Sequence, residues 1–289
     1  MKTLRECINE AHQNKKAVGH FNFATIEGLH AIAEAARELN VPVIVGTAEG
    51  EESFVGTQEA VELVQSIRKE FNQEIFLNAD HHYTLESVKK CIDAGYDMVI
   101  FDGAKLSKEE NSAITKQCVD YAKSTRTEVI VEAELGYIGQ ASQILDAIPE
   151  GVGLSESELT SPEEAQNFIS QTGIDAFAPS VGNVHGMLRN VPDPDLNIAR
   201  IKAIADVVSI PLVLHGASGN SDADIKAAIE AGISVVHVNT ELRRAWKEAL
   251  EQHLKDHPDD VAPYKVLKES KEAMKEVALA KLKLFNNLS

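Results

Sequence analysis

Short apolar runs recur along the chain, and each is followed by a polar turn and a longer segment with apolar residues three to four positions apart. This pattern indicates buried strands that alternate with amphipathic helices. Helical patterns include residues 26–39, 86–94, 161–172 and 222–231, and several end at glycine. The eight apolar runs predict strands at residues 17–22, 42–48, 75–81, 98–103, 128–136, 176–182, 211–216 and 235–240.

Alternating strands and helices form either a closed barrel or an open, doubly wound sheet. The eight units match a (β/α)8 TIM barrel, and polar residues follow many strands, where such a barrel has its active site. An open nucleotide-binding sheet would need a glycine-rich GxGxxG turn after an early strand, whereas the first strand ends in Phe21-Asn22-Phe23. We therefore expect residues 1–289 to form a single TIM-barrel domain with an additional C-terminal helix over residues 266–285.

Composition and net charge say more about possible binding partners than about the fold. A content of 44% hydrophobic and 25% charged residues is ordinary for a soluble globular protein. The net charge of -17 argues against binding to nucleic acid or anionic membranes, so a phosphorylated substrate would need a locally positive site. Cys7, Cys91 and Cys118 have no pairing pattern, which predicts neither disulfides nor a cysteine metal site. We expect a soluble, cytoplasmic protein.

Histidines lie at the ends of three predicted strands. His81 lies in Ala-Asp-His-His, His185 in Gly-Asn-Val-His-Gly and His215 in Leu-His-Gly-Ala-Ser-Gly. A closed barrel gathers its strand ends around one axis, so these imidazoles are expected to converge. Three neutral imidazoles with one coordination position left open are typical of catalytic Zn²⁺. The sequence predicts a zinc site, although a lone histidine in such a place is more often a hydrogen-bonded core or loop residue.

Acidic residues accompany these histidines. Asp80 directly precedes the first of them, where a carboxylate can move a proton or orient a ligand. An N-cap for the next helix is the alternative for Asp80, but Thr84 is better placed for that role. Asp102 and Glu134 also end strands, and we expect them to be metal contacts, with a supporting role or a salt bridge inside the barrel as open alternatives. Glu132 shares the face of Glu134.

Small residues follow the last two predicted strands. Gly216-Ala217-Ser218-Gly219 comes after the seventh strand, and Asn239-Thr240 leads from the eighth directly into a helix. Such turns expose backbone N–H groups at helix N-termini, where barrels commonly hold a phosphate. We therefore expect Gly216, Ser218, Asn239 and Thr240 to bind the substrate's phosphate, and Asn22 to be a further substrate contact.

Five segments occur in the order and spacing of class II fructose- and tagatose-bisphosphate aldolases. The similarity extends over almost the whole chain, so the chain resembles that family. The segments are Asn78-Ala79-Asp80-His81, Val131-Glu132-Ala133-Glu134-Leu135-Gly136, Gly182-Asn183-Val184-His185-Gly186, Leu214-His215-Gly216-Ala217-Ser218-Gly219 and Val238-Asn239-Thr240-Glu241-Leu242.

The resemblance implies a reversible aldol cleavage that yields dihydroxyacetone phosphate, with one Zn²⁺ bound by His81, His185 and His215. In that family the metal polarises the ketone and replaces a Schiff-base lysine. The acid that matches Asp80 handles the proton on the aldehyde oxygen. The resemblance also adds Gly186 to the phosphate-binding residues, and it implies a Na⁺ or K⁺ ion near the phosphate.

Some positions depart from the family pattern, and they concern the rest of the substrate. His237 stands where a substrate-binding asparagine is usual, and it is either a substrate contact or a core residue. Ala48 stands where a serine is expected. The loop at residues 139–143 lacks the acids of the family, so the base for the carbon-three proton is not identified, and Asp146 and Glu150 are only distant substitutes.

A further departure concerns the distal phosphate. Where the family's C-terminal pattern has an arginine that grips this phosphate, the chain has Tyr264 followed by Lys265. A lysine is a point charge and lacks the bidentate fork of arginine. We therefore expect ketose 1-phosphate recognition to persist with an altered preference at the far end, so that the substrate is fructose 1,6-bisphosphate, tagatose bisphosphate or a ketose 1-phosphate.

Two other classes remain as alternatives. A metal-dependent hydrolase is disfavoured because the first strand lacks the His-x-His pair of such barrels and has Gly19-His20-Phe21-Asn22 instead. A non-catalytic sugar-phosphate-binding protein would keep the metal and lose the proton base. We expect the aldolase, as a homodimer or homotetramer in carbohydrate metabolism.

Overall fold

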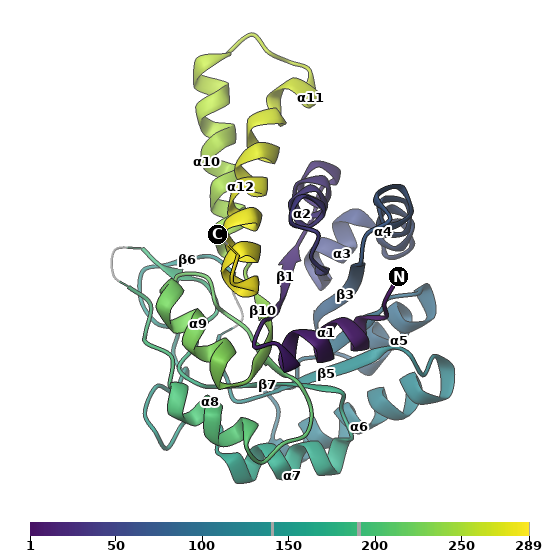
Figure 1. Cartoon of the computed structure of the whole chain (residues 1–289), viewed down its shortest axis with the longest axis vertical. Coiled ribbons are helices and arrows are strands. Elements are labelled where there is room, and N and C mark those ends of the chain that lie inside the picture. The colour runs from purple at the N-terminus through teal and green to yellow at the C-terminus, as the bar shows by residue number, and fades with distance from the viewer. Residues whose placement is uncertain (140–141, 190–191, 289) are drawn as a thin grey trace.

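Eight parallel strands close into a barrel in the order β1-β10-β9-β7-β5-β4-β3-β2 (Figure 1). The computed structural model describes residues 1–139, 142–189 and 192–288. The predicted (β/α)8 TIM barrel is therefore confirmed. Its strands are β1 (Val18–Asn22), β2 (Val43–Ala48), β3 (Ile75–His82), β4 (Met98–Phe101), β5 (Ile130–Leu135), β7 (Ala176–Pro179), β9 (Leu212–Leu214) and β10 (Ile233–His237).

The predicted strand positions hold, but several ends differ. The eighth predicted strand begins at residue 235, whereas β10 begins at Ile233, and the register between β10 and β9 shifts between Ile233 and Val235. It also ended at residue 240, whereas Thr240 is already helical. The sequence missed β6 (Ile144–Leu145) and β8 (Met187–Leu188), two short strands in loops that pair with each other outside the barrel.

Helices surround the barrel, and side-chain caps fix several of their starts. Thr3, Ser107 and Ser161 each cap a helix whose third residue is a glutamate that bonds back to the cap. The helices are α1 (Leu4–Gln13), α2 (Ile26–Leu39), α3 (Glu49–Val55), α4 (Thr57–Phe71), α5 (Leu85–Ala94), α6 (Lys108–Thr125), α7 (Pro162–Thr172), α8 (Ile198–Ala205), α9 (Asp222–Ala231), α10 (Thr240–Asp256), α11 (Pro263–Val266) and α12 (Lys268–Asn286).

The interior of the barrel is apolar at one end and polar at the other. Side chains alternate between the inside and the outside of the barrel along each strand. At one end, Val18, Ile44, Phe76, Met98, Ile130, Ala176, Val213 and Val235 form an apolar cluster with Leu4, Cys7 and Ile8 of α1. Two residues further along β1, β3, β5 and β10, the polar residues His20, Asn78, Glu132 and His237 are buried. Helix α1 thus closes the apolar end, and the polar end carries the chemistry.

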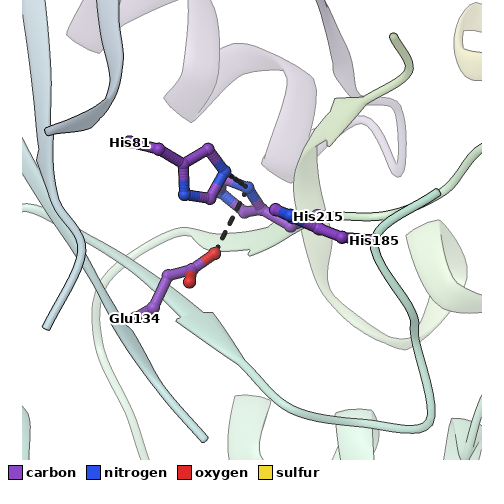
Figure 2. A group of neighbouring side chains, drawn as sticks. All are labelled: His81, Glu134, His185 and His215. Atoms are coloured by element: carbon purple, nitrogen blue, oxygen red, sulfur yellow. Dashed lines mark hydrogen bonds and ion pairs between the residues drawn. The ribbon is translucent and has the colours of Figure 1, made fainter. Parts of the chain in front are cut away.

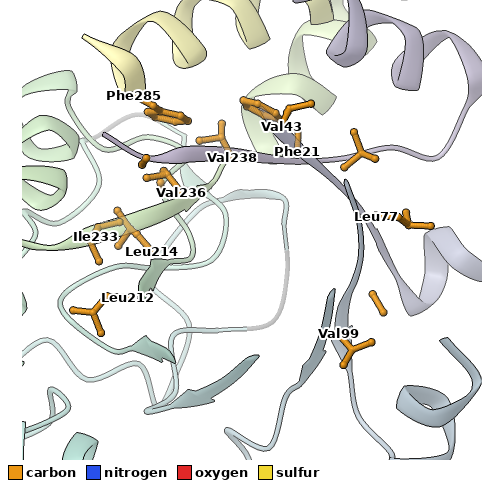
Figure 3. Packing of buried hydrophobic residues seen from close by; sticks show 14 of the residues in the cluster. Phe21, Val43, Leu77, Val99, Leu212, Leu214, Ile233, Val236, Val238 and Phe285 are labelled. Carbon is orange, nitrogen blue, oxygen red and sulfur yellow. The ribbon is translucent and has the colours of Figure 1, made fainter. Parts of the chain in front are cut away.

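The larger apolar cluster lies between the strands and the surrounding helices (Figure 3). Phe21 of β1 stacks on Phe285 of α12 with ring centroids 6.5 Å apart, and both side chains are fully buried. The predicted additional C-terminal helix is therefore confirmed as α12. It forms a hairpin with α10 that extends beyond the barrel, with α11 at its tip (Figure 1). None of the helices in the described residues is long and apolar enough to cross a membrane.

Candidate active site

β3 carries two candidate residues, and an irregularity near its end turns both toward the barrel axis. Along a regular strand, Asp80 and His81 would point to opposite faces. The register between β3 and β4 shifts between Ala79 and His82, and His81 has a left-handed φ of +51°. This bulge aims His81 at the centre of the barrel end. His82 points elsewhere, as predicted, and contacts Cys91 of α5.

The imidazoles of His81, His185 and His215 converge with the carboxylate of Glu134 (Figure 2). One ligand atom from each of the four side chains lies within 4.8 Å of the others. His215 Nδ1 lies 3.1 Å from His81 Nε2 and 3.3 Å from Glu134 Oε1. That oxygen of Glu134 is buried, and no described residue hydrogen-bonds to it. Three imidazoles with a buried carboxylate oxygen that accepts no hydrogen bond from the described residues fit a divalent cation such as Zn²⁺.

Carboxylates hold the outer nitrogens of two of these imidazoles. His215 Nε2 lies 2.6 Å from Glu132 Oε1, which leaves Nδ1 of His215 facing the centre. His81 Nδ1 lies 3.0 Å from Asp102 Oδ2. The carboxylate of Asp102 lies behind His81 and outside the four-residue group, which fits the supporting role that the sequence analysis left open beside a metal contact. Such carboxylate–imidazole pairs fix the ring orientation and tautomer of metal ligands.

The electrostatics of the site favour a bound cation. Burial raises the pKa of Glu134 well above its ordinary value, and the Asp102 charge raises it further. Although burial opposes a proton on His81, the carboxylates of Asp80 and Glu134 raise the pKa of His81 to about 10. Burial, together with the charge on His81, lowers the pKa of His215 to about 3. A divalent ion at the centre would balance the negative charge of these carboxylates.

Asp80 lies beside this group and belongs to a separate hydrogen-bonded chain. Its Oδ2 accepts a hydrogen bond from Asn22 Nδ2 at 2.8 Å, and its Oδ1 is 3.4 Å from His237 Nδ1. Burial opposes the charge on Asp80, but His81 and His237 hold its pKa well below the usual range. Thr84 is the N-cap of α5, accepting from Ser87 N, so the N-cap alternative for Asp80 is excluded.

A cavity at this end of the barrel is lined by His81, His185, His215 and Asp80, and His237 lines it too. Its ring lies between those of His20 and His215, with centroids 3.6 and 3.9 Å away. Burial lowers the pKa of His237 well below its ordinary value, and the imidazole of His20 contributes in the same direction. Neither of its ring nitrogens has a hydrogen-bond partner in the part of the chain that is described. This side chain is buried and also lines the cavity, so its position is compatible with a core residue and with a substrate contact.

The expected phosphate-binding residues line one side of the cavity. Gly186, Gly216, Ser218, Asn239 and Thr240 are all among its lining residues. Gly216 has a φ of +62°, and a Cβ there would stand 2.4 Å from Val184 O, so only glycine allows this approach of the two loops. Thr240 begins α10, whose first backbone N–H groups have no partner within the helix. This geometry suits an anion.

Other residues named from the sequence do not reach the cavity. Tyr264 is 79% exposed at the tip of the α10–α12 hairpin, and its neighbour Lys265 lies near Asp260. Asp146 is paired with Arg189 at the surface, and Glu150 does not line the cavity. In the loop at 139–143, where the family's acidic pattern is missing, residues 140 and 141 lie outside the described residues.

The structure adds three lining residues that the sequence analysis did not single out. They are Tyr83 after β3, Ser142 after β5 and Arg243 of α10. Glu51 of α3 lies next to them and accepts a hydrogen bond from Arg243 Nη2. Glu51 accepts from Ala48 N at 2.9 Å and from Asn22 Nδ2 at 2.7 Å, so it is held at the ends of the first two strands. Arg243 follows Thr240 by three residues, which puts both on one face of α10. This spacing was the signal in the sequence that could have identified Arg243.

Comparison with known proteins identifies related chains. The family described as "Fructose-bisphosphate aldolase class-II" matches residues 2–288. A fructose-bisphosphate aldolase of Geobacillus stearothermophilus is 35% identical over 288 residues, which cover 99% of this chain and 96% of the relative. The crystal structure of the YdjI aldolase from Escherichia coli K12 superposes with a TM-score of 0.81 at 32% identity, covering 98% of this chain and 96% of that one.

A more distant structure agrees in fold. Fructose-bisphosphate aldolase from Campylobacter jejuni superposes with a TM-score of 0.82 at 21% identity, covering 99% of this chain and 94% of that one. At this identity the likeness shows the barrel and carries no further argument about activity.

Proposed function

The chain belongs to the class II fructose-bisphosphate aldolase family, and from that premise we propose that it is a zinc-dependent enzyme for the reversible cleavage of a ketose phosphate, such as fructose 1,6-bisphosphate, into dihydroxyacetone phosphate and an aldehyde. Aldolase activity follows from the family; the zinc ion, the sugar and the roles of single residues are the proposed parts. The observation that carries them is the convergence of His81, His185, His215 and Glu134 within 4.8 Å.

His81, His185 and His215 would hold the Zn²⁺, and Glu134 is an additional or alternative contact. The bound ion would act as a Lewis acid on the ketone oxygen. We assign Asp102 and Glu132 to orientation, since each accepts a hydrogen bond from an imidazole that faces the centre. The nitrogen ligands favour Zn²⁺ over Mg²⁺ or Ca²⁺, which prefer oxygen.

Asp80 is the proposed proton carrier for the bond that breaks. Because its pKa is held low, the carboxylate is ionised at neutral pH and can take the proton from the hydroxyl group that becomes the aldehyde oxygen. In the direction of condensation it returns the same proton. Asn22 keeps the carboxylate in position and is itself a proposed substrate contact. His237 can exchange a hydrogen bond with a substrate hydroxyl through Nε2, which lacks a partner in the described residues, while Nδ1 faces Asp80 Oδ1 at 3.4 Å.

The loops after β7, β9 and β10 would hold the phosphate of the dihydroxyacetone half. Gly186, Gly216, Ser218, Asn239 and Thr240 offer backbone N–H groups, hydroxyls and a helix N-terminus on that side of the cavity. Since charged side chains are few there, the metal and the backbone dipoles supply the positive potential that a chain of net charge -17 otherwise lacks. A Na⁺ or K⁺ ion near these loops is part of the same proposal.

The identity of the sugar substrate depends on which residues contact its distal end. Tyr264 and Lys265 lie away from the cavity of this chain, so they supply no distal phosphate contact within it. The choice among fructose 1,6-bisphosphate, tagatose bisphosphate and a ketose 1-phosphate therefore depends on other residues of the site.

Two measurements test the proposed function. Dihydroxyacetone phosphate should exchange its carbon-three proton with solvent deuterium when protein and Zn²⁺ are both present, as followed by NMR. Ketose phosphates should release dihydroxyacetone phosphate in a coupled assay. A non-catalytic sugar-phosphate-binding protein would bind the ketone without exchange, so absence of both signals would favour that reading.

We also propose that residues 1–289 form one domain that assembles as a homodimer or homotetramer in the cytoplasm. Support for assembly comes from large apolar side chains on the surface, with Phe54, Val261 and Tyr264 exposed by 75%, 89% and 79%. Light scattering after size-exclusion chromatography would test this, and a monomer at micromolar concentration would contradict it.

A further inference from the structure

We propose that Glu52, His82 and Cys91 form a second metal site, for a thiophilic divalent ion such as Zn²⁺, outside the cavity of the candidate active site. One ligand atom from each of the three side chains lies within 4.8 Å of the others, and all three residues are buried. The ion would join α3, the end of β3 and α5. This site is separate from the group that contains His81, and it does not depend on the proposed function.

The imidazole of His82 is the centre of the proposed site. It is fully buried, and among the described residues only the thiol of Cys91 is within hydrogen-bonding distance of its nitrogens, at 3.9 Å from Nε2 and 4.0 Å from Nδ1. A thiol is a weak donor and a weak acceptor. Buried polar groups normally have a full hydrogen-bond partner, so this imidazole is incompletely satisfied by the protein. A metal ion would supply the missing partner.

The carboxylate of Glu52 approaches the same imidazole from α3. Its Oε1 accepts hydrogen bonds from Lys90 Nζ at 2.6 Å and from the hydroxyl of Thr57. Its Oε2 lies 3.9 Å from His82 Nε2, which is too long for a hydrogen bond. The second carboxylate nearby, that of Glu49, lies 3.9 Å from Nδ1, the other ring nitrogen. Glu52 is therefore the carboxylate that can share an ion with Nε2.

The spacing of these atoms is close to that of a zinc site. Nitrogen and oxygen ligands lie about 2.0–2.2 Å from zinc and sulfur about 2.3 Å, so neighbouring ligand atoms of a tetrahedral site are about 3.3–3.6 Å apart. The 3.9 Å separations from His82 Nε2 to Glu52 Oε2 and to Cys91 Sγ exceed this by a few tenths of an ångström. Small rotations of the side chains would close the group around an ion and leave a fourth position for water.

The ligand types select the metal. A thiolate with an imidazole favours Zn²⁺ or Co²⁺ over Mg²⁺ and Ca²⁺, which prefer oxygen. The thiol of Cys91 gives up its proton to solvent when the metal–sulfur bond forms. The thiolate and the carboxylate of Glu52 then balance the two positive charges of the ion. The spacing of the cysteines did not predict this site, because its ligands come from three separate elements.

The competing explanation is that Cys91 only fills space in the core, as buried cysteines commonly do. Cys118 supplies a matched control for this possibility. It is a free cysteine on α6 with the same exposure of 0%, but it belongs to no group of potential metal ligands in the described residues. If Cys91 is only a packing residue, the two cysteines should behave alike toward metal ions.

Cobalt distinguishes the two metal sites by their spectra. A bond between Co²⁺ and a thiolate gives a charge-transfer band in the near ultraviolet, and the group at His81 contains no sulfur. We expect metal-free protein to bind a second Co²⁺ ion per chain, beyond the one at the three histidines, and to develop this band. Zn²⁺ should displace it.

Substitutions assign the band to its ligands. In Cys91→Ser the band and the second ion should both be lost, whereas Cys118→Ser should keep both. The ion that remains at the three histidines shows that Cys91→Ser is folded, and this variant allows the zinc at that group to be counted by itself. Glu52→Gln keeps the volume of the side chain and should weaken the binding that gives the band at least about 10- to 100-fold, the scale for loss of a supporting partner.

The results separate this site from the proposed function. Exchange of the carbon-three proton of dihydroxyacetone phosphate reports the proposed function by itself, so its absence while a second ion binds would count against the aldolase and leave the second site standing. Binding of no second ion, a band that appears only when Co²⁺ greatly exceeds the protein, or a band that survives in Cys91→Ser would overturn the second site. If Cys91→Ser does not fold, Glu52→Gln decides, and unaltered affinity in that variant would overturn the site as well.

Discussion

Replacement of Asp80 by asparagine should separate the proton transfer from the metal site. The amide has nearly the volume of the carboxylate and can still accept the hydrogen bond from Asn22 Nδ2, which lies 2.8 Å from Asp80 Oδ2. It cannot take up the proton of the substrate hydroxyl. Asp80 Oδ1 is 3.8 Å from His81 Nε2, so Asp80 is adjacent to the ligand group without belonging to it.

The expected loss follows from this geometry. A positioned acid or base contributes on the order of 100-fold or more to a rate. That factor corresponds to about 2.7 kcal/mol of activation free energy, at 1.36 kcal/mol for each factor of ten. The loss should appear in kcat, because the carboxylate acts on the bond that breaks. Zn²⁺ content should stay close to that of the unmodified protein.

Three assays on one preparation resolve the prediction: the rate of ketose phosphate cleavage, the Zn²⁺ content and the exchange of the carbon-three proton of dihydroxyacetone phosphate. Exchange should survive in Asp80→Asn, because that half-reaction uses a different group. Asp120→Asn is a matched control, since Asp120 pairs with Lys116 at the surface of α6.

Two outcomes would refute the role of Asp80. Cleavage at the unmodified rate would show that the carboxylate carries no proton, and parallel loss of zinc and activity would show that it acts through the metal site.

Five further substitutions test the site and its support. His81→Ala, His185→Ala and His215→Ala should each weaken Zn²⁺ binding severely in equilibrium dialysis, and stoichiometric zinc in all three variants would show that the ligands were wrongly chosen. Glu132→Gln should weaken Zn²⁺ binding about 10- to 100-fold in a chelator competition, because Glu132 Oε1 lies 2.6 Å from His215 Nε2; unaltered affinity would argue that the pair has no orienting role. Phe285→Ala should lower the free energy of unfolding by about 3–5 kcal/mol in urea titrations, since this fully buried ring stacks on Phe21, and a loss below about 1 kcal/mol would mean that α12 contributes little to the core.

The fold could be predicted from the sequence because each buried strand appears as a short run of apolar residues. Residues 26–39 and 222–231 were predicted as helices, and α2 and α9 have those bounds. The ends of β10 were missed because a shift of register at Ile233 depends on the neighbouring strand β9, which local periodicity does not report. The short strands β6 and β8 were missed because their pairing joins two loops far apart in sequence.

The candidate site could be predicted for a different reason. A closed barrel brings every strand end to one place, so His81, His185 and His215 could be expected together from their positions alone. The different positions of Asp102 and Glu134 could not be predicted, because they depend on which side of the His81 ring each carboxylate reaches. Arg243 was overlooked because its relation to Asp80 runs through Asn22 and Glu51, on two other elements.

Removal and return of the metal tests the central claim most directly. Protein that has been treated with a chelator and verified as metal-free should lose both the cleavage of ketose phosphates and the exchange of the carbon-three proton. Stoichiometric Zn²⁺ should restore both, with Co²⁺ as a further candidate, because His81, His185 and His215 form a nitrogen-ligand site with room for substrate. Cleavage that continues undiminished in verified metal-free protein would contradict the zinc-dependent mechanism.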